Sequence, residues 1–186
     1  MDRRLFLKTM AATLASPAFL PTNVDANAGM ETGRQLNLAR PQSGEKLSII
    51  YKRNGRVDLA AYRRVCALMR DVKADKMLSI DERLLDILDG IRGALVQVGI
   101  NNPTFMVHSA FRTWQTNREV GGALQSYHMR GQAIDFHVPN VPTDILFKWM
   151  KQVKFHEGVG MGYYAGTPNW MHLDSRRTGH MTIWEG

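Results

Sequence analysis

Cysteine is almost absent from this sequence of 186 residues, and the single one, Cys66, excludes any disulfide bond within the chain. Cys66 lies in the apolar run Val65–Met69, so we expect its thiol to pack in the core and not to act as a nucleophile. Long apolar stretches are also missing. The apolar part of the N-terminus is too short and too interrupted to span a membrane. The sequence contains no internal repeat and no low-complexity tract, which leaves one ordinary globular domain as the expectation.

Acidic residues are the scarcer charged type, with 17 Asp and Glu against 24 Lys and Arg, and the formal net charge is +7. The first 28 residues hold three basic and two acidic side chains, so +6 of this charge belongs to the remainder. Such a balance favours an anionic partner such as peptidoglycan, teichoic acid or a phospholipid surface. Charge alone would also suit a nucleic acid.

The chain begins with an arrangement typical of an export signal. The run Arg3–Lys8 has paired arginines followed by Leu-Phe-Leu-Lys, which resembles a twin-arginine signal, and Ala26–Ala28 fits a small-x-small cleavage site. We therefore predict a signal peptide over residues 1–28 and a single domain over residues 29–186, a periplasmic monomer without stable membrane insertion after cleavage. Export argues against nucleic acid as the partner. The alternative for the N-terminus is a disordered basic segment.

Periodicity predicts a mixture of strands and helices. Polar and apolar residues alternate in residues 34–41, as in a half-buried strand, residues 104–108 have the apolar character of a central strand, and apolar residues recur at helical spacing in the expected helices. The predicted strands cover residues 34–41, 45–51, 104–108, 133–138, 158–164 and 170–174, the last being followed only by a short tail. The predicted helices cover residues 58–69, 81–98 and 143–154, and a loop or short helix lies around Asn117. Mixed elements with β-hairpin connections favour an α+β domain.

The segment Ser126–Asp135 contains the strongest indication of function. His128 and Asp135 are seven positions apart, which neither a helix nor a strand brings together, so a turn is required, and Gly131 supplies a flexible residue for it. With His172 near the C-terminus, they form a set of two histidines and one carboxylate. Such a set can hold zinc and leave its fourth position open, as catalytic zinc sites do.

Alternation along the two C-terminal strands places further polar residues beside this set. Asp135 shares a strand face with His137, and His172 shares one with Asp174. His137 is therefore a candidate to contact substrate or to support the ligands. The remaining three histidines (His108, His156 and His180) are expected to be solvated at the surface.

The pattern Ser126-x-His-x-x-Gly-x-Ala-x-Asp135, followed by His172, resembles the zinc signature of the M15 peptidases, which are D-alanyl-D-alanine carboxypeptidases and peptidoglycan endopeptidases. The segment Ser109–Thr113, together with Asn117, resembles the family's Ser-Gly-Tyr-Arg-Ser segment. Residues 158–164 and 172–174 resemble the C-terminal strands of the family. Residues 36–86 resemble the N-terminal half of its murein endopeptidase K branch.

This resemblance implies a single domain with a mainly antiparallel sheet flanked by helices and a zinc site like that of hedgehog and D-Ala-D-Ala peptidases. It implies that the Zn²⁺ ligands are His128, Asp135 and His172, with zinc-activated water as the nucleophile. Arg112 matches an arginine that binds a substrate carboxylate or steadies the oxyanion, although a structural salt bridge is the alternative. Ser126 and His137 are the other substrate-binding candidates.

One departure concerns the general base. Several M15 enzymes place an acid three residues before the last histidine ligand, where this chain has Asn169, which cannot accept a proton. Asp174 is the nearest replacement, as a base or as a residue that orients His172.

The hypothesis is therefore a zinc metallopeptidase that hydrolyses peptide cross-links of peptidoglycan and binds its stem peptides. The alternatives are a D,D-carboxypeptidase and a cell-wall-binding module without catalysis, in which His137 would complete a structural zinc site.

Overall fold

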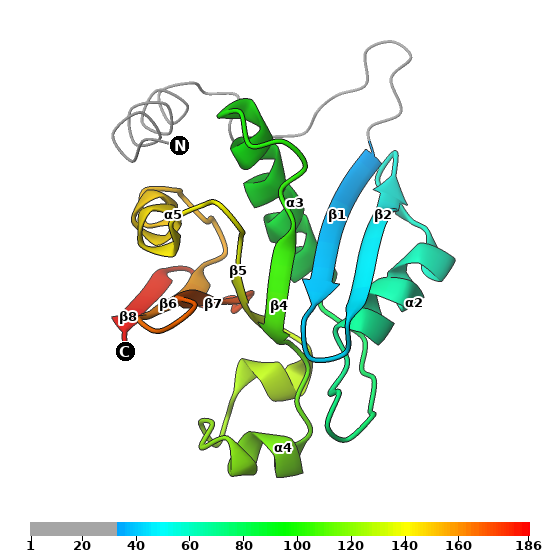
Figure 1. Cartoon of the computed structure of the whole chain (residues 1–186), viewed down its shortest axis with the longest axis vertical. Helices are drawn as coiled ribbons and strands as arrows, with labels where there is room; N and C mark the ends of the chain where they lie inside the picture. The colour runs from blue at the N-terminus through cyan, green and yellow to red at the C-terminus, as the bar shows by residue number, and fades with distance from the viewer. Residues whose placement is uncertain (1–32) are drawn as a thin grey trace.

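The computed structural model describes residues 33–186, so the predicted signal peptide lies outside the described residues and stays a prediction. Eight strands form one sheet in the order β3-β2-β1-β4-β5-β7-β6-β8 (Figure 1). The pairs β1–β4 and β6–β8 are parallel, and the others are antiparallel. The strands are β1 (Gly33–Arg40), β2 (Glu45–Arg53), β3 (Arg56–Val57), β4 (Phe105–Ser109), β5 (Ala133–His137), β6 (Val159–Tyr164), β7 (Trp170–Asp174) and β8 (Met181–Glu185). The prediction of an α+β domain with a mainly antiparallel sheet is confirmed.

The helices begin where the sequence provides capping side chains. Asp58 accepts hydrogen bonds from the backbone of Ala60 and Ala61, and Asp81 accepts one from Arg83, so the first turns of two helices are satisfied. The helical segments are α2 (Leu59–Leu68), α3 (Glu82–Gln97), α4 (Trp114–Glu119), the short 3₁₀ helix η2 (Tyr127–Arg130) and α5 (Thr143–Met150). The last is shorter than predicted, because the chain turns after Lys151. None of the described helices has the length and apolar character needed to cross a membrane.

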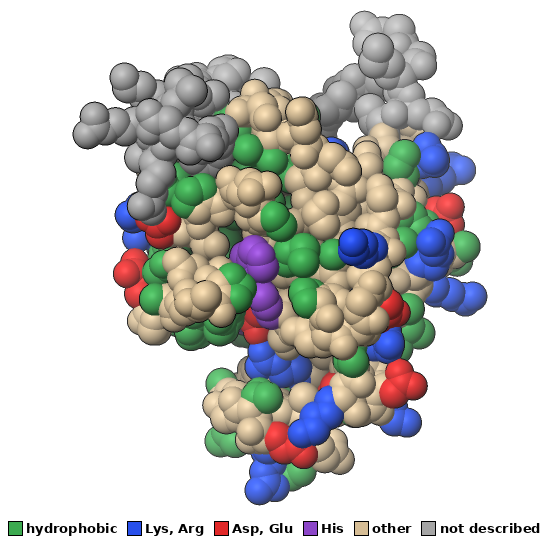
Figure 2. All heavy atoms as spheres, viewed as in Figure 1, with side chains coloured by type: hydrophobic (Ala, Val, Ile, Leu, Met, Phe, Trp, Pro, Cys, Tyr) green, Lys and Arg blue, Asp and Glu red, His purple; other side chains and the backbone are tan. Residues whose placement is uncertain are grey.

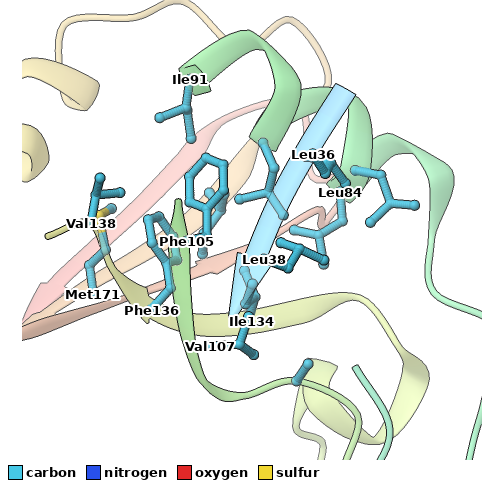
Figure 3. Packing of buried hydrophobic residues seen from close by; sticks show 14 of the residues in the cluster. Leu36, Leu38, Leu84, Ile91, Phe105, Val107, Ile134, Phe136, Val138 and Met171 are labelled. Atoms are coloured by element: carbon cyan, nitrogen blue, oxygen red, sulfur yellow. The ribbon is translucent and has the colours of Figure 1, made fainter. Parts of the chain in front are cut away.

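The core lies between the sheet and the helices α2, α3 and α5 (Figure 1). Figure 3 shows side chains from the central strands packed against those of α3. The labelled residues include Leu36, Leu38, Leu84, Ile91, Phe105, Val107, Ile134 and Phe136. The rings of Phe105 and Phe136 meet edge to face with centroids 5.2 Å apart. Each such side chain contributes about 1.5–3 kcal/mol to folding when it is fully buried. Cys66 is buried in this core, as predicted.

The expectation that residues 170–174 form the last strand was wrong. Residues 181–185 form β8, which pairs with β6 in a parallel register from Val159–Met181 to Tyr163–Glu185. A short edge strand buries little of its surface, so its sequence shows only a weak apolar pattern. This strand brings the C-terminus of the chain beside the functional residues described next.

Candidate metal centre

Local geometry around Gly131 brings the first two predicted ligands together. Ser126 caps η2, and its hydroxyl accepts a hydrogen bond from the backbone N–H of His128 at 3.3 Å. Gly131 then reverses the chain with a φ of 66°, and a Cβ at this position would lie 2.4 Å from the backbone oxygen of Ser79. Only glycine fits both constraints. The chain returns along β5 and presents Asp135 to His128, so the predicted reversal is confirmed.

Strand pairing supplies the third residue of the group. Asp135 on β5 lies directly opposite His172 on β7 in the antiparallel register. Nε2 of His128 is 3.2 Å from Oδ1 of Asp135 and 3.2 Å from Nδ1 of His172, while the latter two atoms are 2.9 Å apart. Zinc bonds of about 2.0–2.2 Å place ligand atoms roughly 3–3.5 Å from one another. Two imidazole nitrogens and one carboxylate oxygen therefore converge at separations close to those around a bound metal ion, and the three residues could hold one.

The outer nitrogens of both histidines have partners that fix the rings. Nδ1 of His128 donates to the backbone oxygen of Ala110 at 2.6 Å, and Nε2 of His172 lies 3.1 Å from Oδ2 of Asp174. Since these oxygens accept, each ring holds its proton on the outer nitrogen and turns the other nitrogen toward the group. Partners of this kind orient metal-binding histidines and raise their basicity.

The electrostatics of the group favour a bound cation. Burial opposes ionisation of Asp135, but the neighbouring His128 and His172 hold the pKa of its carboxyl well below the usual range. Burial lowers the pKa of His128, although the charge of Asp135 opposes this effect. The carboxylate is therefore ionised and His128 is neutral at pH 7, which are the forms that bind metal.

Arg112 contacts the group from the side of β4. Its Nη2 donates to Oδ2 of Asp135, and its Nε donates to the hydroxyl of Ser109 at 2.6 Å. Its side chain is only 16% exposed. Arg112 thus makes the salt bridge that the sequence left as an alternative, and it also lines the cleft described below.

Asp174 is completely buried behind His172 and is bound by Arg176, a residue that no sequence motif marks. Nε and Nη2 of Arg176 lie 2.8 and 2.6 Å from the two carboxylate oxygens. Burial would raise the pKa of Asp174, but the hydrogen bonds from Arg176 and His172 hold it well below the usual range. Arg83 on α3 donates to the backbone oxygens of Ser175 and Arg176, which fixes the segment that follows β7.

A cleft of about 720 Å³ opens over the metal group. The loop between α4 and η2 forms one wall, where Ser126 lines the cleft. Aromatic residues of β6, β7 and β8 form the other: Tyr164 stacks on Trp170 with centroids 4.0 Å apart and accepts a hydrogen bond from Trp184 at 2.8 Å. In the view of Figure 2, histidine side chains reach the surface near the middle of the molecule, with basic and acidic side chains below them.

The other predicted site residues lie at the margin of the cleft or outside it. His137 is not among the residues that line it, and its Nδ1 lies 2.7 Å from Nε2 of His108. His137 is thus not part of the group that could hold a metal among residues 33–186. The expectation that His108 is simply solvated was wrong, because it lines the cleft and is half-buried. His156 and His180 are exposed, as predicted.

Asn169 lies outside the cleft and has a structural role. Its side-chain oxygen accepts a hydrogen bond from the backbone of Gly166 at 2.9 Å, and its nitrogen donates to the hydroxyl of Tyr163 at 3.1 Å. The position that holds an acid in several M15 enzymes therefore contributes no proton-accepting group to this cleft.

Comparison with known proteins supports the same family. The family model described as peptidoglycan L,D-endopeptidase MepK, of the M15 peptidases, matches residues 28–184. The chain belongs to this family. It is 29% identical to the peptidoglycan L,D-endopeptidase MepK of Escherichia coli strain K12 over 184 residues, which cover 96% of each chain. It is also 29% identical over 174 residues to the probable peptidoglycan L,D-endopeptidase MepK of Haemophilus influenzae, covering 91% of this chain and 88% of the relative.

Proposed function

We propose that this protein is a zinc-dependent peptidoglycan endopeptidase that cleaves L,D cross-links between stem peptides in the periplasm. The observation that carries the proposal is the buried group of His128, Asp135 and His172 at the base of an open cleft. The family match covers all three residues, and the relatives reported above are named as a peptidoglycan L,D-endopeptidase and a probable one. Their names favour the L,D bond over the D,D bond.

In this proposal His128, Asp135 and His172 hold zinc. Bound zinc would act as a Lewis acid that polarises the scissile carbonyl and activates water. Ala110 and Asp174 keep the two rings aimed at the ion through their outer nitrogens. Arg112 lines the cleft beside the group, and in this proposal its guanidinium stabilises a substrate carboxylate or the oxyanion that develops during attack.

The charge of the cleft suits an anionic substrate once a divalent cation is bound. The charged residues that line it are two arginines, Arg112 and Arg176, and two aspartates, Asp135 and Asp174. Because these charges cancel, a dication gives the cleft a positive potential. Stem peptides of peptidoglycan carry free carboxylates, and the excess of basic residues over the whole chain adds to the attraction.

The test is digestion of purified peptidoglycan by the zinc-loaded protein beside the His172→Ala variant, with fragments identified by mass spectrometry. Cross-linked dimers should fall to monomers only with the intact metal group, and the masses should show cleavage of the L,D bond. Cleavage of D,D bonds alone, or removal of terminal residues alone, would contradict the proposed specificity. An intact dimer fraction with zinc bound would favour the wall-binding module.

Export and a monomeric state complete the proposal. The twin-arginine pattern at Arg3–Lys8 supports delivery to the periplasm, where a protein that acts on peptidoglycan meets its substrate. Fractionation of cells that express the full chain, compared with a variant in which both arginines are lysines, would test this route.

A further inference from the structure

Amide hydrolysis needs a group that accepts a proton from water and returns it to the leaving amine. Among the described residues that line the cleft, the carboxylates and imidazoles other than His108 are already engaged. His128, Asp135 and His172 form the metal group. Asp174 is completely buried, and both of its oxygens accept hydrogen bonds from Arg176. Among the carboxylates and imidazoles that line the cleft, His108 is therefore the candidate for this proton transfer.

A β-bulge places His108 at the cleft. On β4, Val107 pairs with Phe136 and Ser109 pairs with Asp135, so His108 is the extra residue between two successive pairs. Bulges re-aim side chains and are common next to active sites. Here the bulge puts an imidazole into the cleft that the metal group also lines, and the next residue, Ser109, holds Arg112.

His137 fixes the orientation of this imidazole. Nε2 of His108 lies 2.7 Å from Nδ1 of His137, and the ring planes are within 26° of parallel. The ring centroids are 4.9 Å apart, which is about the nitrogen–nitrogen distance plus the distance from each nitrogen to the centre of its own ring. The two rings therefore meet end to end through one hydrogen bond. The contact uses Nε2 of His108 and does not involve Nδ1, the other nitrogen of the same ring.

The hydrogen bond also determines what that nitrogen can do. When Nε2 of His108 carries the shared hydrogen and donates it to His137, Nδ1 of His108 has a lone pair and can accept a proton. Burial lowers the pKa of His108, although the charge of Asp135 opposes the shift. The ring is therefore neutral at pH 7, as a general base must be.

We infer that His108 is the proton-transferring residue of the proposed reaction and that His137 is its positioning residue. This inference rests on the proposed endopeptidase function. One water molecule is consumed: its oxygen bonds to the carbonyl carbon, and one of its protons passes to Nδ1 of His108. As the carbon–nitrogen bond breaks, the leaving amine takes that proton, and His108 is neutral again. No other reactant is needed.

The experiment measures kcat, KM and zinc content for the full-length zinc-loaded protein and its His108→Ala and His108→Gln variants on a cross-linked peptide dimer. Glutamine can still hydrogen-bond to His137 but cannot carry the proton. Both variants should lose about 100-fold or more in kcat, with KM within about threefold of wild type and one zinc retained. Added imidazole should restore part of the kcat of His108→Ala. His156→Ala, at an exposed histidine outside the cleft, is the matched control.

The outcomes separate this inference from the function on which it rests. An active wild type with unchanged kcat in either variant would overturn the role of His108 and leave the proposed function intact. The role of His108 would also be overturned if His108→Gln restores the activity that His108→Ala loses, or if only KM rises. A zinc-loaded wild type that cleaves no cross-link would overturn both.

Discussion

Arg176 holds both carboxylate oxygens of Asp174, with Nε 2.8 Å from Oδ1 and Nη2 2.6 Å from Oδ2. The backbone N–H of Gly160 donates to Oδ1 at 3.0 Å, and Nε2 of His172 lies 3.1 Å from Oδ2. A buried carboxylate with this many donors is a poor proton acceptor, because protonation would break several charge-assisted hydrogen bonds. Of the two roles that the sequence left open for Asp174, we therefore favour orientation of His172.

Asp174→Asn distinguishes these two roles. If Asp174 orients His172, the variant should bind zinc about 10–100-fold more weakly and recover most of its kcat at saturating zinc. Zinc affinity is measured by competition with a chromophoric chelator, and activity is measured across a zinc titration. A large loss of kcat at full zinc occupancy and unchanged zinc affinity would instead assign Asp174 as the general base.

Gly160 leaves the space that Arg176 needs. A Cβ at this position would lie 2.2 Å from Oδ2 of Asp174 and 2.4 Å from Nη2 of Arg176. We expect Gly160→Ala to displace the arginine, to lower the free energy of unfolding by about 1–3 kcal/mol and to weaken zinc binding. Gly90→Ala is the matched control, because nothing lies within 4 Å of its Cβ and alanine favours α3 by about 0.5–1 kcal/mol.

Thermal melts and zinc titrations of both glycine variants provide the measurement. The prediction fails if Gly160→Ala melts and binds zinc like wild type, since Arg176 would then have other room to move. A destabilised Gly160→Ala protein that keeps full zinc affinity would show that the position of Arg176 matters for folding alone.

The members of the metal group could be predicted from the sequence, partly from local geometry and partly from the resemblance to the M15 peptidases. The spacing from His128 to Asp135 requires a turn, and Gly131 has the positive φ that this turn needs. Alternation grouped Asp135 with His137 on β5 and His172 with Asp174 on β7, but it is the β5–β7 register of the structure that brings Asp135 opposite His172. The helices predicted to begin at residues 58 and 81 do begin there, and in the structure Asp58 and Asp81 cap them.

Features that depend on long-range pairing could not be predicted in this way. Trp184 reaches the cleft only because β8 runs parallel to β6, and no local spacing encodes that register. The bulge at His108 lies in a strand, Phe105–Ser109, whose sequence gives no sign of an extra residue. Arg176 follows a predicted strand, but its contact with Asp174 depends on the path of a loop that Arg83 fixes from α3.

Asp71 links folding stability to pH near the site. Its carboxylate accepts hydrogen bonds from the backbone and hydroxyl of Thr113 at 2.8 Å each, next to Arg112, and from the backbone of Lys73 and Ala74 at 3.1 Å. Burial alone would raise the pKa of Asp71, but these bonds lower it below the ordinary value. The ionised form is thus preferred more strongly in the folded state than in the unfolded state.

The sign of the pH dependence follows from this lowered pKa. The stabilisation is complete above the unfolded-state pKa of about 3.9 and is lost as pH falls through the lower folded-state value. Asp71→Asn should therefore be less stable than wild type by about 1–3 kcal/mol at pH 7, and the difference should shrink below pH 4. Urea unfolding at pH 7, 5 and 3 measures it. A difference that stays constant with pH would show that the charge of Asp71 is not responsible.

Metal removal tests the ligand set independently of activity. Because the three ligands come from η2, β5 and β7, zinc should bind the folded chain and not the unfolded one. Zinc at 100 times its Kd would then stabilise the fold by about 2.7 kcal/mol, and chelation should lower Tm by about 5–10 °C. His128→Ala should show no such shift, whereas His156→Ala should respond like wild type. A His128→Ala protein that still binds one zinc tightly would contradict the ligand assignment. Since a structural zinc would also raise Tm, this melt identifies the ligands, and digestion of peptidoglycan decides between enzyme and binding module.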